Sequence, residues 1–279
     1  IIAFSRWGKV ASAITASQII HFGAKEIIFA GVAGSPTLEV GDIVIGNNVW
    51  QHDMDASPFF KPHEIPMINK SSFEIDYERR QLLLKSSIEF IKTTDLENTK
   101  YKIKIPKVIV GDIASGDAFL ANENKTREIM ARMPKVVCFE MEGGSVGQVC
   151  FEHNIPFSII RIISDKAGES SPDALFGFGF IKEVASNYLL GILKNLFTKF
   201  DISEKTPIYC CDTAKNILQE WIDKQSHDRC WYYPDLFKKL MSLFDVKPTK
   251  EPNLPLEEEF KNGCERYRKE EYSEKEHCE

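Results

Sequence analysis

The chain has 279 residues, of which 43% are apolar and 27% charged, and its formal net charge is −6 at pH 7. This composition is ordinary for a globular protein and allows one large domain with an appendage, or two smaller domains. The negative charge gives no electrostatic reason to expect nucleic acid or an anionic membrane as a partner. No apolar run reaches the roughly 18 residues of a membrane span.

The first residues and the cysteines indicate whether the chain carries a signal peptide and in which redox compartment it resides. Ile1 to Phe4 lack the basic region and cleavage site of a signal peptide. Their apolar pattern predicts a strand that starts upstream, so we expect further residues before Ile1. The seven cysteines form no CxxC pair, and Cys138 and Cys150 lie in apolar patterns typical of buried thiols. A reducing, cytoplasmic setting is the favoured interpretation, and a zinc site among the C-terminal cysteines is the weaker alternative.

Up to about residue 200 the chain alternates between strand and helix patterns. Short apolar runs predict strands at residues 1–4, 26–30, 42–49, 102–112, 136–140 and 157–163. Helical spacing predicts helices at residues 10–22, 74–92, 123–133, 143–153 and 181–200, and a loop is expected at 50–72. Continuous apolar strands alternating with helices indicate an α/β fold. We expect a three-layer sandwich with a mixed, mostly parallel central sheet flanked by helices.

The chain changes character after residue 200. Two short amphipathic patterns predict helices at residues 213–223 and 235–244, within a helical appendage covering 201–249. Residues 250–279 are charged and poor in apolar side chains, so they cannot bury enough surface to offset the entropy of ordering. This tail is predicted to be disordered.

Acidic residues follow two of the predicted strands, at the point where each strand ends. Asp165 comes just after the apolar run 159–163, and Glu140 and Glu142 end or follow the strand at 136–140. Ligands of open α/β sheets bind at the carboxyl ends of the strands. There, Asp165 can act as a general acid toward a leaving base, and a glutamate can accept two hydroxyls of a ribose. The alternatives are a turn or helix N-cap for Asp165, and solvated helix-start acids for the glutamates.

Other loops at predicted strand ends carry weaker signals. Residues 31–34 (GVAG) form a glycine turn that can bring backbone N–H groups close to a ligand, although a plain tight turn is the commoner reading. Phe119, in the loop SGDAF, can stack on a purine or belong to the core. Residues 52–55 (HDMD) look like metal ligands, but no second cluster supports a metal site, and we interpret them as structural.

The sequence motifs described above, taken in their order along the chain, resemble those of the nucleoside phosphorylase superfamily. They are most similar to those of the 5′-methylthioadenosine/S-adenosylhomocysteine nucleosidases. The matching blocks are GVAGSPTLEVGDIVI (31–45), QHDMDASPF (51–59), SGDAF (115–119), FEMEGGSVGQVC (139–150) and IIRIISDKAG (159–168). The resemblance covers residues 1–200 and implies hydrolysis of an N-glycosidic bond to adenine and a thioribose, without an organic cofactor or metal.

The resemblance also implies roles for particular residues. Asp165 is expected to protonate adenine N7, steadied by Ser164. Glu142 is expected to hold the ribose hydroxyls beside Met141, and Phe119 to stack on adenine.

Further roles follow from the same resemblance. The backbone of Leu120 is expected to read the adenine edge, Ala33 and Gly34 to line the pocket floor, and Arg161 to help place the attacking water. The family acts as a homodimer, in which a partner subunit lends the loop that contains Ala56 and Phe59. The water-activating carboxylate of the family lies in a strand and loop that we expect before Ile1.

Two alternatives stay open. A purine nucleoside phosphorylase would need a basic group for phosphate, and Arg6 is the residual candidate. A non-catalytic module that binds an adenine nucleoside is the second alternative, since the water-activating carboxylate is not among these residues.

Overall fold

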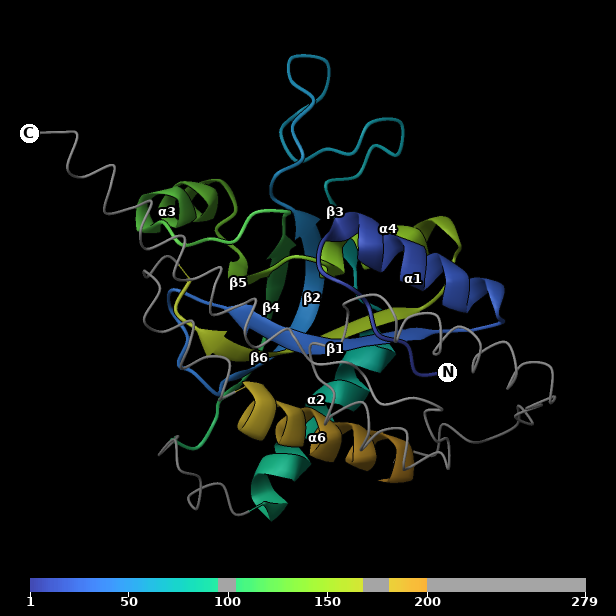
Figure 1. Cartoon of the computed structure of the whole chain (residues 1–279), viewed down its shortest axis with the longest axis vertical. Helices are drawn as coiled ribbons and strands as arrows, with labels where there is room; N and C mark the ends of the chain where they lie inside the picture. Colours follow the sequence, from blue (N-terminus) through green and yellow to red (C-terminus); the bar gives the residue numbers. More distant parts are fainter. Residues whose placement is uncertain (95–103, 168–180, 200–279) are drawn as a thin grey trace, which may run out of the picture.

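The computed structural model describes residues 1–94, 104–167 and 181–199 (Figure 1). Its elements in chain order are α1 (Lys9–His21), β1 (Ile27–Gly34), β2 (Ile43–Gln51), β3 (Ser72–Glu74), α2 (Tyr77–Thr93), β4 (Val108–Ser115), α3 (Glu123–Arg132), β5 (Val136–Glu140), α4 (Gly143–Glu152), β6 (Phe157–Asp165), the π-helical turn η1 (Ile181–Ala185) and α6 (Ser186–Lys199).

The six strands form one mixed sheet in the order β3-β2-β4-β5-β1-β6. The pairings β1–β6, β2–β4 and β4–β5 are parallel and are the longer ones, whereas β1–β5, β2–β3 and β2–β6 are antiparallel. Because β6 also pairs with β2, the sheet curls round and closes on itself. Helices flank this sheet, and the predicted fold class is confirmed.

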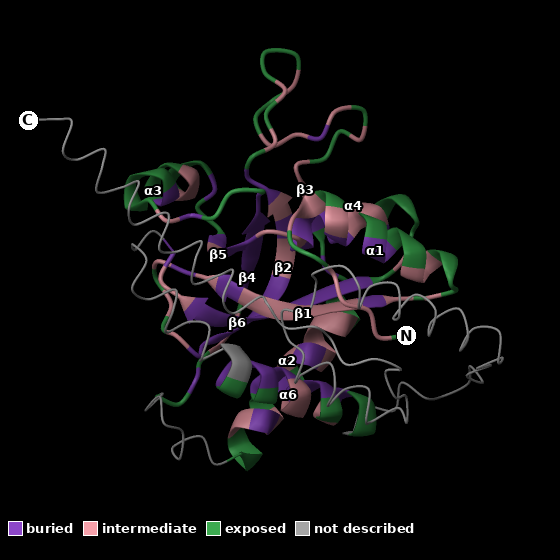
Figure 2. Cartoon of the chain, viewed as in Figure 1, coloured by how far each residue is buried: buried purple, intermediate pink, exposed green. Residues whose placement is uncertain are grey.

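Helices cover the sheet from two sides (Figure 1). α1 and α4 pack together on one side, and α2 and α6 pack together on the other. Figure 2 shows buried residues along the strands and exposed residues on the outer faces of the helices. Each side has its own apolar cluster, so burial of two separate helix pairs stabilises the curled sheet.

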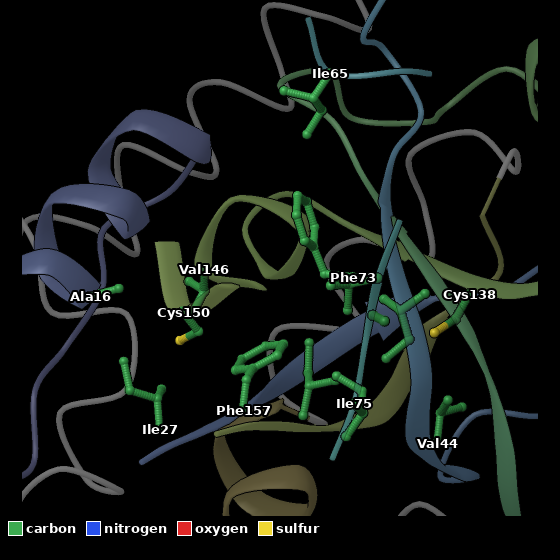
Figure 3. Packing of buried hydrophobic residues seen from close by; sticks show 14 of the residues in the cluster. Ala16, Ile27, Val44, Ile65, Phe73, Ile75, Cys138, Val146, Cys150 and Phe157 are labelled. Atoms are coloured by element: carbon green, nitrogen blue, oxygen red, sulfur yellow. The ribbon is translucent and has the colours of Figure 1, made fainter. Parts of the chain in front are cut away.

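The cluster beneath α1 and α4 joins these two helices to residues from all six strands (Figure 3). Ala16 of α1 and Val146 and Cys150 of α4 pack with Ile27 of β1 and Phe157 of β6. The small residues of α4 let this helix lie directly on the sheet. A Cβ atom at Gly144 would lie 2.6 Å from the carbonyl oxygen of Trp50 in β2, so only glycine permits this approach.

Several predicted strand and loop boundaries need correction. Residues 31–34, predicted as a glycine turn, continue strand β1 to Gly34 and pair with β6. Residues 1–4, predicted as a strand, pair with no strand, and Ile1 is 65% exposed. The strand predicted from residue 102 begins only at Val108, just after Pro106, which has no N–H for a sheet ladder. The loop predicted at 50–72 runs into a short strand, β3, which pairs with β2.

The helix predictions are confirmed within a few residues, from α1 to α6, although the last begins with the turn η1. The appendage predicted at 201–249 and the tail at 250–279 lie outside the described residues. In the part of the chain that the structure describes, no helix is long and apolar enough to cross a bilayer.

Candidate active site

Strand pairing gathers the predicted site residues at one edge of the sheet. Gly34, the last residue of β1, pairs with Asp165 at the end of β6 and with Phe139 near the end of β5. Across β5, Glu140 pairs with Ser115, the last residue of β4. The carboxyl ends of four strands therefore lie in one row, and the carboxyl ends of strands are where ligands bind in α/β proteins with open or closed sheets.

Asp165 is held in place by residues on both sides of it. The hydroxyl of Ser164, a buried residue, donates to Asp165 Oδ2 at 2.7 Å. On the neighbouring strand, a Cβ atom at Gly34 would lie 2.5 Å from Asp165 Oδ1, so the absence of a side chain there makes room for the carboxyl group. Ala33, the residue before Gly34, is buried in the core. One oxygen is thus fixed by a hydrogen bond and the other packs over the end of β1.

Glu142 is the N-cap residue of α4, but its side chain makes no cap hydrogen bond to that helix. Its Oε1 accepts instead from the backbone N–H of Gly8, at the start of α1, at 3.0 Å. Burial of the side chain and the nearby charge of Glu140 raise the pKa of Glu142 to about 7, against the opposing effect of the Gly8 N–H. Glu142 therefore changes charge near neutral pH, and in its ionised form it can accept two hydroxyl donors.

Glu140 lies behind Glu142 in a buried network. Its carboxylate forms an ion pair with Arg161, with 2.6 Å between Oε2 and Nη2. It also accepts hydrogen bonds from the hydroxyl of Ser115 and from the backbone N–H of Gly143, at 2.8 Å to Oε1. The sequence indicated that Glu140 ends a strand but gave no sign of this partner. The network fixes the peptide on the helix side of Glu142.

Arg161, expected to help place an attacking water, is 1% exposed. Beyond its pair with Glu140, its Nη1 donates to two backbone carbonyls, those of Phe29 and Ile160, each at 3.2 Å. Its guanidinium carbon also lies 4.4 Å from the centroid of the Phe29 ring. Four contacts thus hold Arg161 in the sheet, and its role toward water stays a prediction.

The residues expected to contact adenine differ in their exposure. Phe119, in the loop after β4, is 64% exposed, so its ring is open to a ligand. Leu120 is buried in a cluster that includes Phe139 and Ala167. Met141 lies half-buried between the two glutamates. An exposed ring next to a buried neighbour suits a stacking surface at the edge of a pocket.

Ala56 and Phe59 lie on the long loop between β2 and β3, which projects from the body of the molecule (Figure 1). Phe59 is 87% exposed and Ala56 half-buried. The structure thus places these two residues on an outlying loop, apart from the strand-end row that carries Asp165 and Glu140.

The sequence interpretation missed the contribution of the first turn of α1. An open groove of about 470 Å³ lies there, lined by Arg6, Trp7, Gly8, Lys9, Val10, Ala11, Ile14 and Asp117. Because Gly8 also donates to Glu142, this groove adjoins the carboxylate. The signals in the sequence were Arg6, the residual candidate for phosphate, and Asp117, which shares the loop SGDAF with Phe119. Among the described residues, no three His, Cys, Asp or Glu side chains are grouped to hold a metal ion.

Comparison with known proteins decides the family. The sequence model described as Phosphorylase superfamily matches residues 1–197. The chain belongs to the phosphorylase superfamily.

Several known members of the phosphorylase superfamily are similar to this chain. An aminodeoxyfutalosine nucleosidase of Campylobacter jejuni is 34% identical over 203 residues, covering 70% of this chain and 81% of its own. A 5′-methylthioadenosine/S-adenosylhomocysteine nucleosidase of Oceanobacillus iheyensis is 34% identical over 176 residues, covering 61% and 70%. The nucleosidase of that name from Neisseria meningitidis, solved with methylthio-immucillin-A, is 29% identical with a TM-score of 0.58, covering 68% of this chain and 77% of its own.

The site of this phosphorylase-superfamily member contains two carboxyl groups that are suited to different chemical roles. Asp165 is oriented by a serine hydroxyl and can donate a proton, while Glu142 can accept hydroxyl groups in its ionised form. The two carboxyl groups stand at the ends of different elements that meet at one edge of the sheet. This arrangement suits a substrate with a basic ring nitrogen and neighbouring hydroxyls.

Proposed function

We propose that this protein hydrolyses the N-glycosidic bond of 5′-methylthioadenosine and of S-adenosylhomocysteine, giving adenine and the thioribose. The observation that carries the proposal is the row of strand ends that sets Asp165 beside Gly34, with Glu142 just beyond β5. The relatives named as nucleosidases support it, because two of them match this chain in sequence over 70% and 61% of its length and the third matches it in structure over 68%.

The proposed reaction separates charge across the bond between C1′ and the base nitrogen. As that bond breaks, its electron pair moves onto adenine and positive charge develops on the ribose. A proton from Asp165 to N7 neutralises the leaving base, and general acid help of this kind is worth about 10²–10⁴-fold in rate. Water then adds to C1′ and releases a proton to solvent, and Asp165 takes up a proton from solvent, so that the products are adenine and a thioribose with a hydroxyl at C1′ and the acid is restored. In this proposal Arg161 helps to place the water.

Glu142 serves the sugar half of the substrate. In its ionised form it accepts the two vicinal hydroxyls of the ribose, beside Met141. Its negative charge also favours the cationic sugar of the transition state over the neutral substrate, which is the condition for catalysis rather than binding alone. Phe119 stacks on adenine, the Leu120 backbone reads the adenine edge, and Ala33 with Gly34 forms the pocket floor.

We further propose a homodimer in which the loop of Ala56 and Phe59 completes the alkylthio end of the partner's pocket. The 87% exposure of Phe59 on a projecting loop supports this, because a large apolar side chain that is so exposed suits an interface. A reducing, cytoplasmic setting is part of the proposal, in keeping with the free thiols of Cys138 and Cys150. Light scattering on the purified protein measures its molecular mass in solution. The mass of two chains supports the homodimer, and the mass of one chain contradicts it.

A phosphorylase reaction on the same substrates is the second candidate. The open groove at the start of α1 is lined by Arg6, whose guanidinium is suited to a phosphate. In that reaction phosphate replaces water at C1′, and the sugar leaves as a 1-phosphate.

One assay separates these reactions. Adenine release from 5′-methylthioadenosine is followed with and without phosphate, and the sugar product is identified. We expect equal rates in the two buffers and a free thioribose. Release that requires phosphate would assign a phosphorylase, and binding without release would leave an adenine-nucleoside-binding module. Running S-adenosylhomocysteine and aminodeoxyfutalosine in parallel ranks the substrates.

A further inference from the structure

The first turn of α1 is held by residues from other parts of the chain rather than by its own cap. Its N-cap residue, Gly8, provides no side-chain hydrogen bond. The backbone N–H of Lys9 donates instead to Asp117 Oδ1, in the loop after β4, at 2.8 Å. The backbone N–H of Gly8 donates to Glu142 Oε1 at 3.0 Å. Two carboxylates therefore share the amino end of one helix, where the helix dipole favours negative charge.

Asp117 is itself fixed by a second pair of contacts. Its backbone N–H donates to Asp53 Oδ2 at 2.9 Å, and Asp53 Oδ1 forms an ion pair with the Lys9 ammonium at 2.6 Å. Although burial alone would raise the pKa of Asp53, the hydrogen bonds from Lys9 and Asp117 hold it below its usual value. Lys9 is thus tied to Asp117 twice: directly through its backbone and, through Asp53, by its side chain.

The backbone at Gly8 leaves little freedom for another arrangement. Gly8 has a φ of 90°, and a Cβ atom there would lie 3.0 Å from Asp117 Oδ1. On the other side, α1 is joined to α4 through the hydroxyls of Ser12 and Ser145, which lie 2.8 Å apart. Ser145 Oγ also donates to the carbonyl of Glu142 at 2.7 Å. The position of this turn therefore decides where the Gly8 N–H meets Glu142.

Several charged or polar groups face the Glu142 carboxyl group. Burial and Glu140 disfavour its ionised form, whereas the Gly8 N–H, Arg161 and a backbone N–H of its own turn favour it. Among these, the Gly8 N–H is the one supplied by α1, and that helix is the element that Asp117 and Lys9 hold in place. A change at Asp117 therefore reaches Glu142 through the helix.

We propose that Asp117 is a positioning residue, which fixes the first turn of α1 so that the Gly8 N–H keeps Glu142 ready to bind the ribose hydroxyls. The inference rests on the proposed function of Glu142 as the ribose-binding carboxylate. A role confined to capping α1 would change stability alone, whereas positioning changes the ionisation of Glu142 and the binding of substrate.

The test compares Asp117→Ala with Asp117→Asn. Both variants remove the same charge, but the asparagine keeps an oxygen that can accept from the Lys9 N–H. Because Asp117 is exposed, both are expected to fold. In Asp117→Ala the first turn of α1 is no longer fixed, so the hydrogen bond from the Gly8 N–H to the ionised Glu142 is weakened and the pKa of Glu142 rises. We therefore expect the acid limb of the kcat/KM profile to move upward by about 0.5 to 1 pH unit and KM at pH 7 to increase. Asp117→Asn should restore most of the wild-type profile.

The matched control is Asp76→Ala. Asp76 caps α2 through the Arg79 N–H at 2.9 Å, on the side of the sheet away from α1 and α4, so its loss should lower stability and leave the pH profile unchanged. An Asp117→Ala variant that behaves like Asp76→Ala would overturn the proposal. If Asp117→Ala fails to fold, the same kcat/KM profiles are measured for Asp53→Ala and Asp53→Asn. A shift of the acid limb in Asp53→Ala that Asp53→Asn largely restores then supports the proposal, and no shift overturns it.

A second measurement makes failure of the positioning role distinguishable from failure of the proposed function. The pKa of Glu142 is measured without any substrate, from the effect of Glu142→Gln on the unfolding free energy across pH, in the wild-type and in the Asp117→Ala background. A higher pKa of Glu142 in the Asp117→Ala background supports positioning even if the protein releases no adenine. An equal pKa in both backgrounds refutes positioning, whatever the activity.

Discussion

Glu140 and Arg161 form an ion pair at 2.6 Å whose side chains are only 3% and 2% exposed. Buried charges of this kind are costly to desolvate, and further hydrogen bonds to each charge offset part of that cost, although Arg161 Nε has no hydrogen-bond partner. Here the carboxylate also accepts from Ser115 and Gly143, and the guanidinium donates to backbone carbonyls. The pair joins β5 to β6, and Glu140 Oε2 also accepts from the backbone N–H of Glu142 at 3.2 Å, so the pair helps to hold the backbone of the proposed ribose-binding residue.

Removing one partner of this pair should destabilise the fold strongly. We expect Arg161→Met to lower the free energy of unfolding by about 3–5 kcal/mol, because Glu140 is left buried without its counter-charge. The control is Arg127→Met, which removes the exposed Arg127–Glu123 pair of α3 and should cost no more than about 0.5 kcal/mol. Urea unfolding measures both. Similar small costs for the two variants would show that Glu140 does not depend on Arg161.

Glu142 should make stability fall as the pH rises toward neutrality. Its pKa is about 7 in the folded protein, against an ordinary value of 4.5, so the folded state holds the extra proton between these pH values. The stabilisation from the protonated form is complete below pH 4.5 and is lost as the pH rises through 7. The unfolding free energy of wild type minus that of Glu142→Gln should therefore decrease across this range. A difference that stays constant with pH would contradict the raised pKa.

The sequence predicted the local elements better than their assembly. Within the described residues, apolar spacing located α1, α2, α3, α4 and α6, and β5 has the predicted bounds, Val136–Glu140. The strand predicted at 1–4 was wrong because an apolar run alone does not provide a strand partner. The closure of the sheet by β2 and β6 could not be predicted, because no local pattern specifies antiparallel pairing between Ile43 and Ile162.

The same limit applies to the site. Asp165 and Glu142 could be predicted because each follows an apolar strand, and strand ends are where ligands bind. The contacts of Gly8 with Glu142 and of Lys9 with Asp117 join residues 134 and 108 positions apart, so no spacing rule reveals them. They depend on how α1 packs against α4, which only the folded structure shows.

Phe119 should contribute to substrate binding and little to folding. A base that stacks on an aromatic ring gains about 1–3 kcal/mol, so we expect Phe119→Ala to raise KM about tenfold or more. Its melting temperature should match wild type, because the ring is 64% exposed. The control is Phe151→Ala, which removes a partly exposed phenylalanine that lies in α4 and should leave KM unchanged. Equal KM values for wild type and Phe119→Ala would exclude stacking.

Gly34 should be needed for the position of Asp165. In Gly34→Ala, the new methyl group would lie 2.5 Å from Asp165 Oδ1, so the carboxyl group must move. A displacement of about 1 Å can cost roughly 10²-fold in rate, and we expect a loss of this order in kcat. In the matched variant Gly111→Ala the methyl group meets a Val137 methyl at the same distance, which should lower stability but not kcat. Steady-state kinetics with thermal melts separate the two effects, and an unchanged kcat in Gly34→Ala would contradict the assigned role of Asp165.

The most direct measurement is the rate of adenine release from 5′-methylthioadenosine by wild type and by Asp165→Asn. The asparagine keeps the size of the side chain and can still accept from Ser164, but it has no acidic proton to donate. We predict that wild type releases adenine and that Asp165→Asn is slower by about 10²–10⁴-fold, with an unchanged melting temperature. Equal rates for the two proteins would contradict the account, since the base would then leave without the proton of Asp165.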